Sequence, residues 1–178
     1  NGSVNQVPAD NHLRFIPTNN TYIDTESNIY NDYEWTHVAA TYDAENMIAD
    51  LFVNGESVGG VLEGDANFSS SFINNSDNPF LIGMRQYNVF GFNGMIKNVR
   101  VSNTIRYNDD FNPNEYLESD EYTIGLWNFE EGEGNILHDS SGNNNHGEIF
   151  GAEWVSETSS SYEDCCYDFY NDYDNDGV

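Results

Sequence analysis

The sequence predicts an all-β fold with almost no helix. Two neighbouring stretches, Thr36–Tyr42 and Met47–Val53, alternate between two side-chain faces, as strands with one buried face do. No segment shows the sustained 3.6-residue period of apolar residues that a surface helix requires. Asn, Asp, Gly and Ser are abundant whereas Ala, Lys and Leu are scarce, and this composition favours strands and tight turns.

Short strands are expected before this pair. Leu13–Ile16 is a strand candidate that we expect Pro17 to end, because proline cannot donate a backbone hydrogen bond to a neighbouring strand. Thr21–Asp24 is a second candidate, and Ile29–Tyr33 leads toward the first long strand. Residues 1–10 are polar and rich in turn formers, so we interpret them as a loop or a frayed edge.

The central element is a predicted antiparallel hairpin. The turn formers of residues 43–46 separate its two strands, and the dipeptide Asn54-Gly55 follows the second strand. Asn-Gly readily supplies the two positive φ angles of a type I′ turn. We therefore expect a third run, Glu56–Val61, to return along the second strand and complete a meander.

The later part of the chain is expected to contain further strands. Phe80–Met84 is a compact apolar strand candidate, Gly94–Ser102 is the next, and a short strand is expected near Ser71–Ile73. Ile105–Glu121 is rich in Asp, Asn and Pro, which predicts a crossing loop rather than a helix. Tyr122–Phe129 is strongly apolar and is expected to be a buried strand.

The charge of the chain is strongly negative. Thirty-one acidic residues against five basic ones give a formal net charge of −26. Such a surface repels phosphate backbones and anionic membranes, so we expect no nucleic-acid partner. No apolar run has the length of a membrane span, so we expect no membrane insertion. The acidity indicates either solubility in a salty exterior or binding of divalent cations, mainly calcium.

Two motif series resemble laminin-G-like domains of the concanavalin-A-like lectin/glucanase superfamily. The first is W-T-H-V-A-A-T-Y-D with L-F-V-N-G, followed by P-F-L-I-G-M and F-N-G-M-I-K-N-V-R-V-S-N. The second, G-L-W-N-F-E-E-G-E-G-N with D-S-S-G-N-N-N-H-G, ends near Val155. The resemblance implies a two-sheet antiparallel jelly-roll sandwich. Lys97 stands where the family pattern has an acidic residue, so a role for that carboxylate does not carry over.

We expect residues 1–155 to form the sandwich, and residues 156–178 an acidic linker with the start of a calcium-binding repeat. Domains of this family have several strands before the hairpin, and few residues precede it here. The first strands are therefore expected to be missing from this sequence, as in an interior piece of a longer chain, or to come from a neighbouring chain. Cys165 and Cys166 are adjacent, and such pairs seldom bond to each other without strain. We expect their partners to lie elsewhere; a metal or redox site is the alternative.

Two stretches are candidate calcium sites. The loop Asp139–Asn145 offers a carboxylate and amide oxygens, and the resemblance suggests that Asp139 and Asn143 help to hold a calcium ion. The alternative is a turn in which Asp139 accepts backbone N–H bonds. In the tail, Asp172, Asp174 and Asp176 precede Gly177 in the D-x-D-x-D-G pattern of calcium loops, and this stretch resembles the opening of a thrombospondin type-3 repeat. A solvated acidic linker is the alternative.

Catalytic patterns are weak. Glycosidases hold two carboxylates across a sugar cleft, and the nearest run, Glu118–Glu121, lies in a predicted loop. His37 is interpreted as a packed or surface histidine, and His138 and His146 lack the further ligands that zinc requires. For sugar binding, Tyr87, Phe90 and Phe92 are candidate aromatic platforms, and core packing is the alternative for them.

We therefore predict a non-catalytic extracellular or cell-surface module for adhesion or recognition, which binds a glycan or a matrix protein with calcium as a structural ion. Two alternatives stay open. One is a structural subunit that self-associates into a fibre or sheath by strand addition. The other is a glycan-hydrolysing enzyme or its accessory module.

Overall fold

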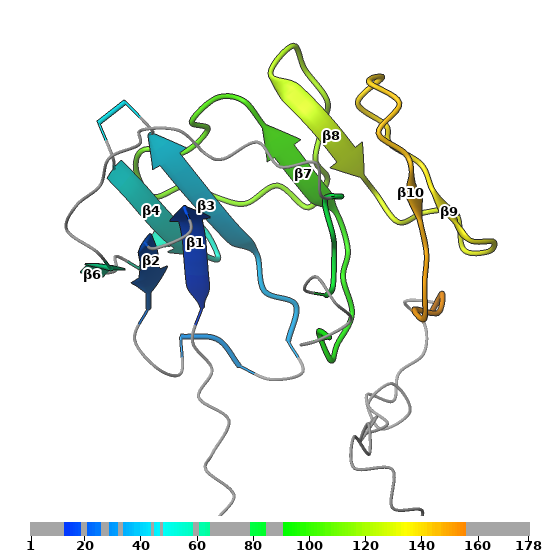
Figure 1. The fold of residues 1–178 in the computed structure, drawn as a ribbon, viewed down its shortest axis with the longest axis horizontal. Coiled ribbons are helices and arrows are strands. Elements are labelled where there is room, and N and C mark those ends of the chain that lie inside the picture. The colour runs from blue at the N-terminus through cyan, green and yellow to red at the C-terminus, as the bar shows by residue number, and fades with distance from the viewer. Residues whose placement is uncertain are drawn as a thin grey trace, which may run out of the picture.

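The structure is a computed structural model that describes residues 13–18, 21–25, 29–31, 34–43, 45–46, 48–58, 61–64, 79–84 and 91–155. These residues form ten antiparallel strands and no helix (Figure 1), which confirms the predicted fold class. The described part accordingly contains no helix with the length and apolar character needed to cross a membrane. The strands are β1 Arg14–Thr18, β2 Thr21–Asp24, β3 Val38–Asp43, β4 Ile48–Val53, β5 Glu56–Ser57, β6 Val61–Gly64, β7 Val99–Ser102, β8 Thr123–Trp127, β9 Ile136–Leu137 and β10 Gly147–Glu148.

The central hairpin is confirmed as a three-stranded sheet in the order β3-β4-β5. Val38 lies opposite Val53, and the register continues without a shift to Asp43 opposite Ile48. The turn between β4 and β5 has φ angles of 52° at Asn54 and 85° at Gly55, the two positive values predicted for a type I′ turn. The sheet therefore has β3 at one edge and the short β5 at the other.

A second sheet has the order β1-β2-β6, and it corrects two predictions. Pro17 does not end the first strand, since β1 continues to Thr18; proline is tolerated because β1 is an edge strand whose register shifts between Phe15 and Thr18. The run after Asn54-Gly55 does not stay in one sheet. Glu56–Ser57 pairs with β4, whereas Val61–Gly64 pairs with β2.

The third sheet pairs β7 with β8, and a short β9–β10 pair follows. Two predicted strands are shortened or absent here. Phe80–Met84 is a bend, and the Phe80 ring stacks on Trp127 with centroids 5.6 Å apart. Within Gly94–Ser102, only β7 is a strand, because Asn98 has a left-handed backbone with φ of 57° directly before it.

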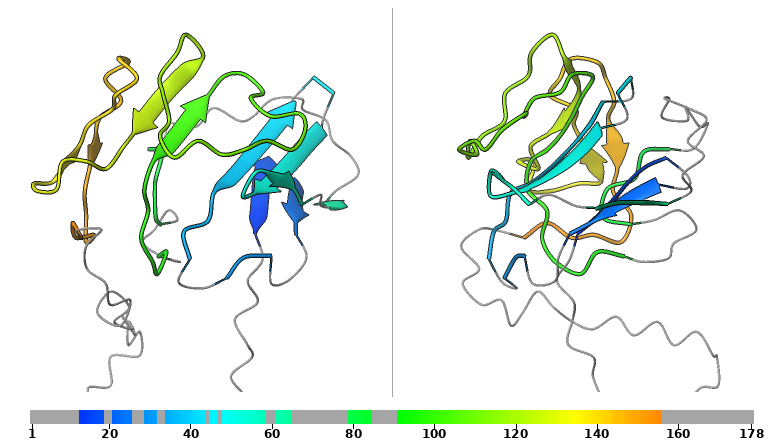
Figure 2. Two further views of the ribbon diagram at one scale, coloured as in Figure 1. Left: turned by 180° about the vertical axis from the view of Figure 1, so that it is seen from behind. Right: turned by 90° about the vertical axis from the view of Figure 1, so that its left-hand side faces the viewer.

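The strands form two layers: in the side view, β1 and β2 lie to the right of β3 and β4 and apart from them (Figure 2, right). Leu51, Phe52 and Val53 are all buried although neighbouring residues of a strand point to opposite faces, so both faces of β4 are covered. The other buried apolar side chains among the described residues are Leu126, Trp127 and Leu137. The core of the described residues therefore has two centres, one on β4 and one on β8 and β9.

Candidate functional site

A groove of about 1150 Å³ runs along β3 and β7. Its volume is slightly above the usual range for ligand sites, about 300–1,000 Å³. Trp35, 53 % exposed, lies at this groove, and so does Val38, which is 47 % exposed. The groove is lined by Phe15, Trp35–Asp43, Asn54, Lys97–Arg100, Ser102–Tyr107, Pro113–Glu115 and Leu117.

Three of the chain's five basic residues line this groove: Lys97, Arg100 and Arg106. Lys97 Nζ lies 6.0 Å from the centroid of the Tyr116 ring. Arg100 donates hydrogen bonds to two neutral oxygens, the Glu118 carbonyl at 3.4 Å and the Tyr107 hydroxyl at 3.1 Å. In a chain with a net charge of −26, the groove is therefore where cationic side chains gather.

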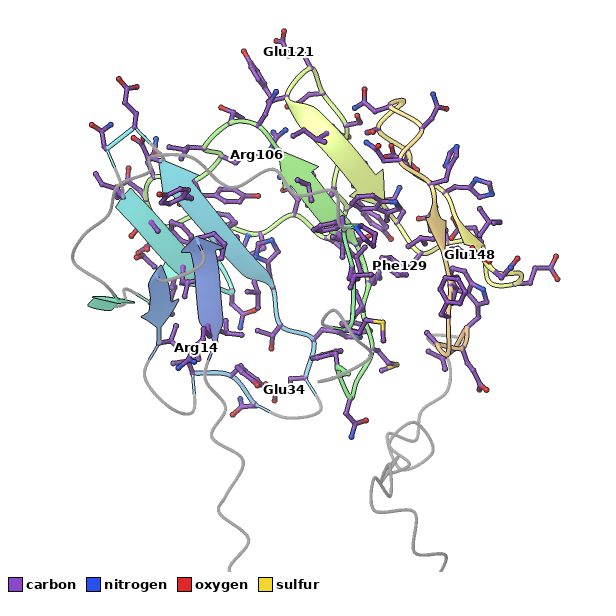
Figure 3. The ribbon with its side chains drawn as sticks, in the orientation of Figure 1. Arg14, Glu34, Arg106, Glu121, Phe129 and Glu148 are labelled. Atoms are coloured by element: carbon purple, nitrogen blue, oxygen red, sulfur yellow. The ribbon has the colours of Figure 1, made fainter. Side chains whose placement is uncertain are left out.

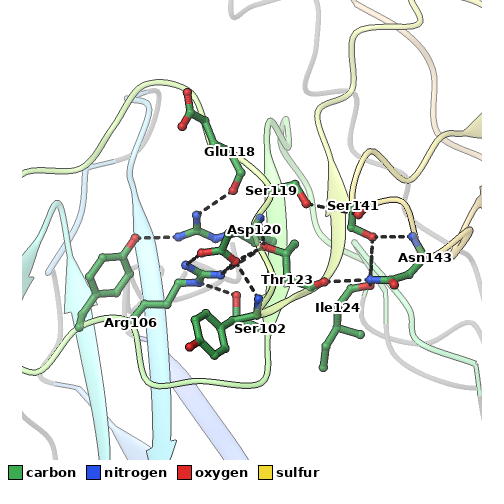
Figure 4. A network of polar contacts seen from close by, with 12 residues as sticks. Ser102, Arg106, Glu118, Ser119, Asp120, Thr123, Ile124, Ser141 and Asn143 are labelled. Carbon is green, nitrogen blue, oxygen red and sulfur yellow. Dashed lines mark hydrogen bonds and ion pairs between the residues drawn. The ribbon is translucent and has the colours of Figure 1, made fainter.

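Arg106, a groove residue that follows β7 in the chain (Figure 3), forms an ion pair with Asp120 (Figure 4). Its two terminal nitrogens contact the two carboxylate oxygens of Asp120 at 2.9 and 2.6 Å, and its Nε donates to Ser102 Oγ at 2.6 Å. Hydrogen bonds from Arg106 and then from Thr123 lower the pKa of the Asp120 carboxyl far below its ordinary value. The charge of Arg106 is thus already paired, whereas Arg100 has neutral partners in the described residues.

Aromatic rings of the crossing loop close one side of β3. Tyr107 and Phe111 stack face to face with centroids 3.6 Å apart, and His37 packs edge-on against Phe111 at 5.5 Å. Phe52 meets the same Phe111 ring at 5.6 Å. Burial, and then the nearby charge of Arg100, lower the pKa of His37, so its ring is neutral at pH 7. The interpretation of His37 as a packing residue is confirmed.

Asp139, a predicted calcium ligand, is buried against the outer edge of β8. Its Oδ1 accepts hydrogen bonds from the backbone N–H groups of Leu126 at 2.9 Å and Ser141 at 2.8 Å. Its Oδ2 accepts from the Asn145 N–H at 2.9 Å and the Ser141 hydroxyl at 2.7 Å. These four donors use the four lone-pair positions of a carboxylate. The geometry thus favours the alternative interpretation, a carboxylate-centred turn, and does not fit a cation at Asp139.

The pKa of Asp139 reflects these contacts. Burial by itself would raise the pKa, but the hydrogen bonds from Leu126, Ser141 and Asn145 outweigh it and lower the pKa to about 2. Asn143 acts through its amide donor, which bonds to the carbonyls of Thr123 at 2.9 Å and Ile124 at 3.0 Å (Figure 4). The Asp139–Asn145 loop therefore supplies hydrogen-bond partners to the backbone groups at the edge of β8 that does not pair with β7.

The remaining predicted site residues are not brought together in the described part of the chain. Phe92 is 61 % exposed and is not among the groove residues. His138 and His146 meet edge-on at 5.2 Å, and no group of three or more His, Cys, Asp or Glu in the described residues could hold a metal ion. Tyr87, Phe90, Asp172, Asp174, Asp176 and both cysteines lie outside the described residues.

The groove residues that sequence reasoning overlooked are Trp35 and Arg100. Trp35 was visible only as the first letter of the hairpin motif. A signal for the basic residues was present, because three of five cations fall between positions 97 and 106 of a very acidic chain. Their placement in one groove with Trp35 has no sequence signal, since the groove joins segments about 60 residues apart.

A family model of the concanavalin A-like lectin/glucanases superfamily matches residues 2–112, more than half of the chain. The chain belongs to this superfamily. The resemblance that the hairpin motifs indicated is thereby confirmed, and the D-S-S-G-N motif lies beyond the matched residues. No curated protein and no solved structure gives a significant match to the chain. Membership in the concanavalin A-like superfamily supports a general role as a carbohydrate- or protein-binding module.

Proposed function

We propose that this protein is a non-catalytic extracellular recognition module that binds its partner in the groove along β3 and β7. The observation that carries the proposal is that exposed Trp35 and the Arg100 cation line one concave surface. An exposed tryptophan offers apolar area with little entropy to lose, and an arginine is suited to bind carboxylate or sulfate groups. The partner is a glycan or a protein of the cell exterior.

The chemistry of the carboxylates supports a non-catalytic role. A glycosidase needs a carboxyl group with a raised pKa as its general acid. The described residues whose carboxyl pKa is shifted are Asp43, Asp120 and Asp139, and all three are shifted downward. Asp43, which borders the groove, is held ionised first by the Asn46 side chain and also by backbone N–H groups of its own turn.

Two features support an extracellular location. Laminin-G-like domains are commonly extracellular, and a net charge of −26 suits a salty medium that screens self-repulsion. Calcium as a structural ion stays a prediction for the D-x-D-x-D-G stretch of the tail. It is not part of the proposal for the groove.

The experiment compares Trp35→Ala with Phe150→Ala on panels of immobilised glycans and extracellular-matrix proteins. Phe150 is 73 % exposed and is not a groove residue, so it is a matched control for loss of an exposed aromatic ring. We expect Trp35→Ala to weaken binding of any captured partner by at least about tenfold, roughly the contribution of one interface anchor. Equal binding by the two variants would place the binding surface elsewhere.

A further inference from the structure

The outer edge of β3 is open in the described part of the chain. The turn at Asn54-Gly55 pairs Val53 with β5, and Val58 N–H donates to the Leu51 carbonyl at 2.9 Å. The backbone groups of Leu51 and Val53 thus bond toward β5. Those of Asp50 and Phe52 therefore bond toward β3. Because these bonds alternate along an antiparallel pair, the N–H and C=O groups of Val38, Ala40 and Tyr42 point away from β4, toward the groove.

Among the described residues, the outer edge of β7 is also open. Leu126 N–H donates to Asp139, and the Leu126 carbonyl accepts from Ser140 N–H at 2.7 Å, so both backbone groups of Leu126 point away from β7. Arg100 lies opposite Leu126. By the same alternation the N–H and C=O groups of Arg100 point away from β8, again toward the groove.

These two edges border one groove and run in the same direction (Figure 1, Figure 2). A strand placed between them in the opposite direction would be antiparallel to both. It would join β5-β4-β3 and β7-β8 into one continuous sheet and would pair backbone groups that are otherwise left unpaired at exposed edges. Donors and acceptors at two-residue spacing along β3, with those of Arg100 on the facing wall, match an extended peptide.

The two faces of such a strand would differ. His37 and Arg100 both contact Tyr107, so they lie on the face that the crossing loop covers. Val38 and Ala40 of β3, and Val99 of β7, lie on the opposite face because side chains alternate along a strand. Phe15 of the other layer also lines the groove. A fitting peptide therefore alternates acidic residues, toward Arg100, with apolar residues, toward Val38 and Ala40.

We propose that the groove takes an extended segment of a partner protein, alternating acidic and apolar residues, as an inserted strand between β3 and β7. This inference rests on the proposed function and names the class of its partner. The affinity comes from main-chain hydrogen bonds on both sides and the selectivity from Arg100 and the apolar face.

Amide hydrogen exchange of the full chain is the first test. We expect the amides of Val38, Ala40, Tyr42 and Arg100 to exchange rapidly in the protein alone, while those of Ala39 and Thr41, bonded to β4, are protected. Slow exchange at all four open-edge amides in the monomer would overturn the proposal, because it would mean that another part of the same chain already fills the groove.

The second test titrates a capped peptide of about eight residues that alternates valine with aspartate, a length typical of a strand. We expect it to bind, to protect the four open-edge amides by at least about tenfold, and to bind at least about tenfold more tightly than the matching valine–lysine peptide. A peptide N-methylated at alternate residues, on the edge facing β3 or β7, cannot form the backbone bonds and should not bind. Equal binding by the methylated peptide, or no binding by the aspartate peptide, would contradict strand insertion.

Two further outcomes separate this inference from the proposed function. Ala40→Pro removes one backbone N–H donor from the open edge. Because proline is tolerated at a strand edge, the variant should still fold but should no longer bind the peptide. A heparin-derived oligosaccharide is the second probe. If it binds without protecting the open-edge amides, and Trp35→Ala abolishes its binding, the recognition function stands and strand insertion fails. If neither peptide nor oligosaccharide binds and the panels capture nothing, both fail.

Discussion

The carboxylate of Asp139 accepts a hydrogen bond from the backbone N–H of Leu126, with Oδ1 and nitrogen 2.9 Å apart, and so takes the place of a neighbouring strand at the outer edge of β8. Ser140 N–H returns the second bond to the Leu126 carbonyl at 2.7 Å. A loop side chain thus satisfies one edge of β8, while β7 pairs with the other. A motif that resembles a cation site here serves instead as a hydrogen-bonding partner of the sheet.

Replacing Asp139 by alanine is expected to destabilise the protein strongly. The change leaves the buried N–H of Leu126 and two loop N–H groups without an acceptor, and each such group costs about 1–3 kcal/mol. We expect a loss of about 2–5 kcal/mol in the free energy of unfolding, measured by urea denaturation with tryptophan fluorescence. Asp109→Asn, at an exposed position, is the control and should change it by less than about 0.5 kcal/mol. A small effect of Asp139→Ala would contradict the edge role.

The lowered pKa of Asp139 predicts how the stability of the protein depends on pH. The pKa of Asp139 is lowered to about 2 in the folded protein, so the unfolded chain takes up this proton first as the pH falls. The stabilisation is complete above the ordinary pKa of about 4 and is lost as the pH falls from there through about 2. Urea denaturation at stepped pH should give a steeper decline for the natural protein than for Asp139→Asn. Parallel declines of the two proteins would mean that protonation of Asp139 is not coupled to unfolding.

Gly55 should tolerate alanine far less than another glycine with a similar backbone. A Cβ at Gly55 would lie 1.9 Å from the Phe111 carbonyl oxygen, whereas one at Gly132 would meet nothing within 4 Å; the φ angles are +85° and +70°. The left-handed backbone alone costs an alanine about 1–2 kcal/mol, and we expect this for Gly132→Ala. Gly55→Ala should lose at least about 1–3 kcal/mol more through overpacking. Thermal unfolding of the pair measures the difference, and equal losses would argue against the close approach of the crossing loop.

Calcium binding is expected to depend on the tail and not on Asp139. The lone pairs of Asp139 are used by four hydrogen-bond donors, whereas the D-x-D-x-D-G pattern places three carboxylates at the alternate positions of a calcium loop. Calorimetric titration of the chelator-treated protein should give binding heat that Asp139→Asn keeps and Asp174→Ala loses. Loss of heat in Asp139→Asn alone would place the ion in the sandwich, and no heat in the natural protein would contradict a calcium site in either place.

Local structure was largely predictable from local sequence. The Asn54-Gly55 turn and the strands on either side follow from alternation and from the positive φ that these two residues accept, so the hairpin needed no tertiary information. The apolar run Phe80–Met84 misled the prediction, because the same residues serve as well in a bend whose first ring packs on Trp127. Pro17 misled it because its tolerance depends on lying in an edge strand.

The chain alone thus determined the fold class, the superfamily and the central hairpin, since all three depend on residues close together in sequence. The tertiary structure decided which edges stay open, that Asp139 serves the sheet, and that Trp35 shares a groove with Arg100. These features join segments far apart in the chain. Whether a backbone group is paired or free depends on which strands become neighbours, and alternation within one strand carries no information about its neighbour.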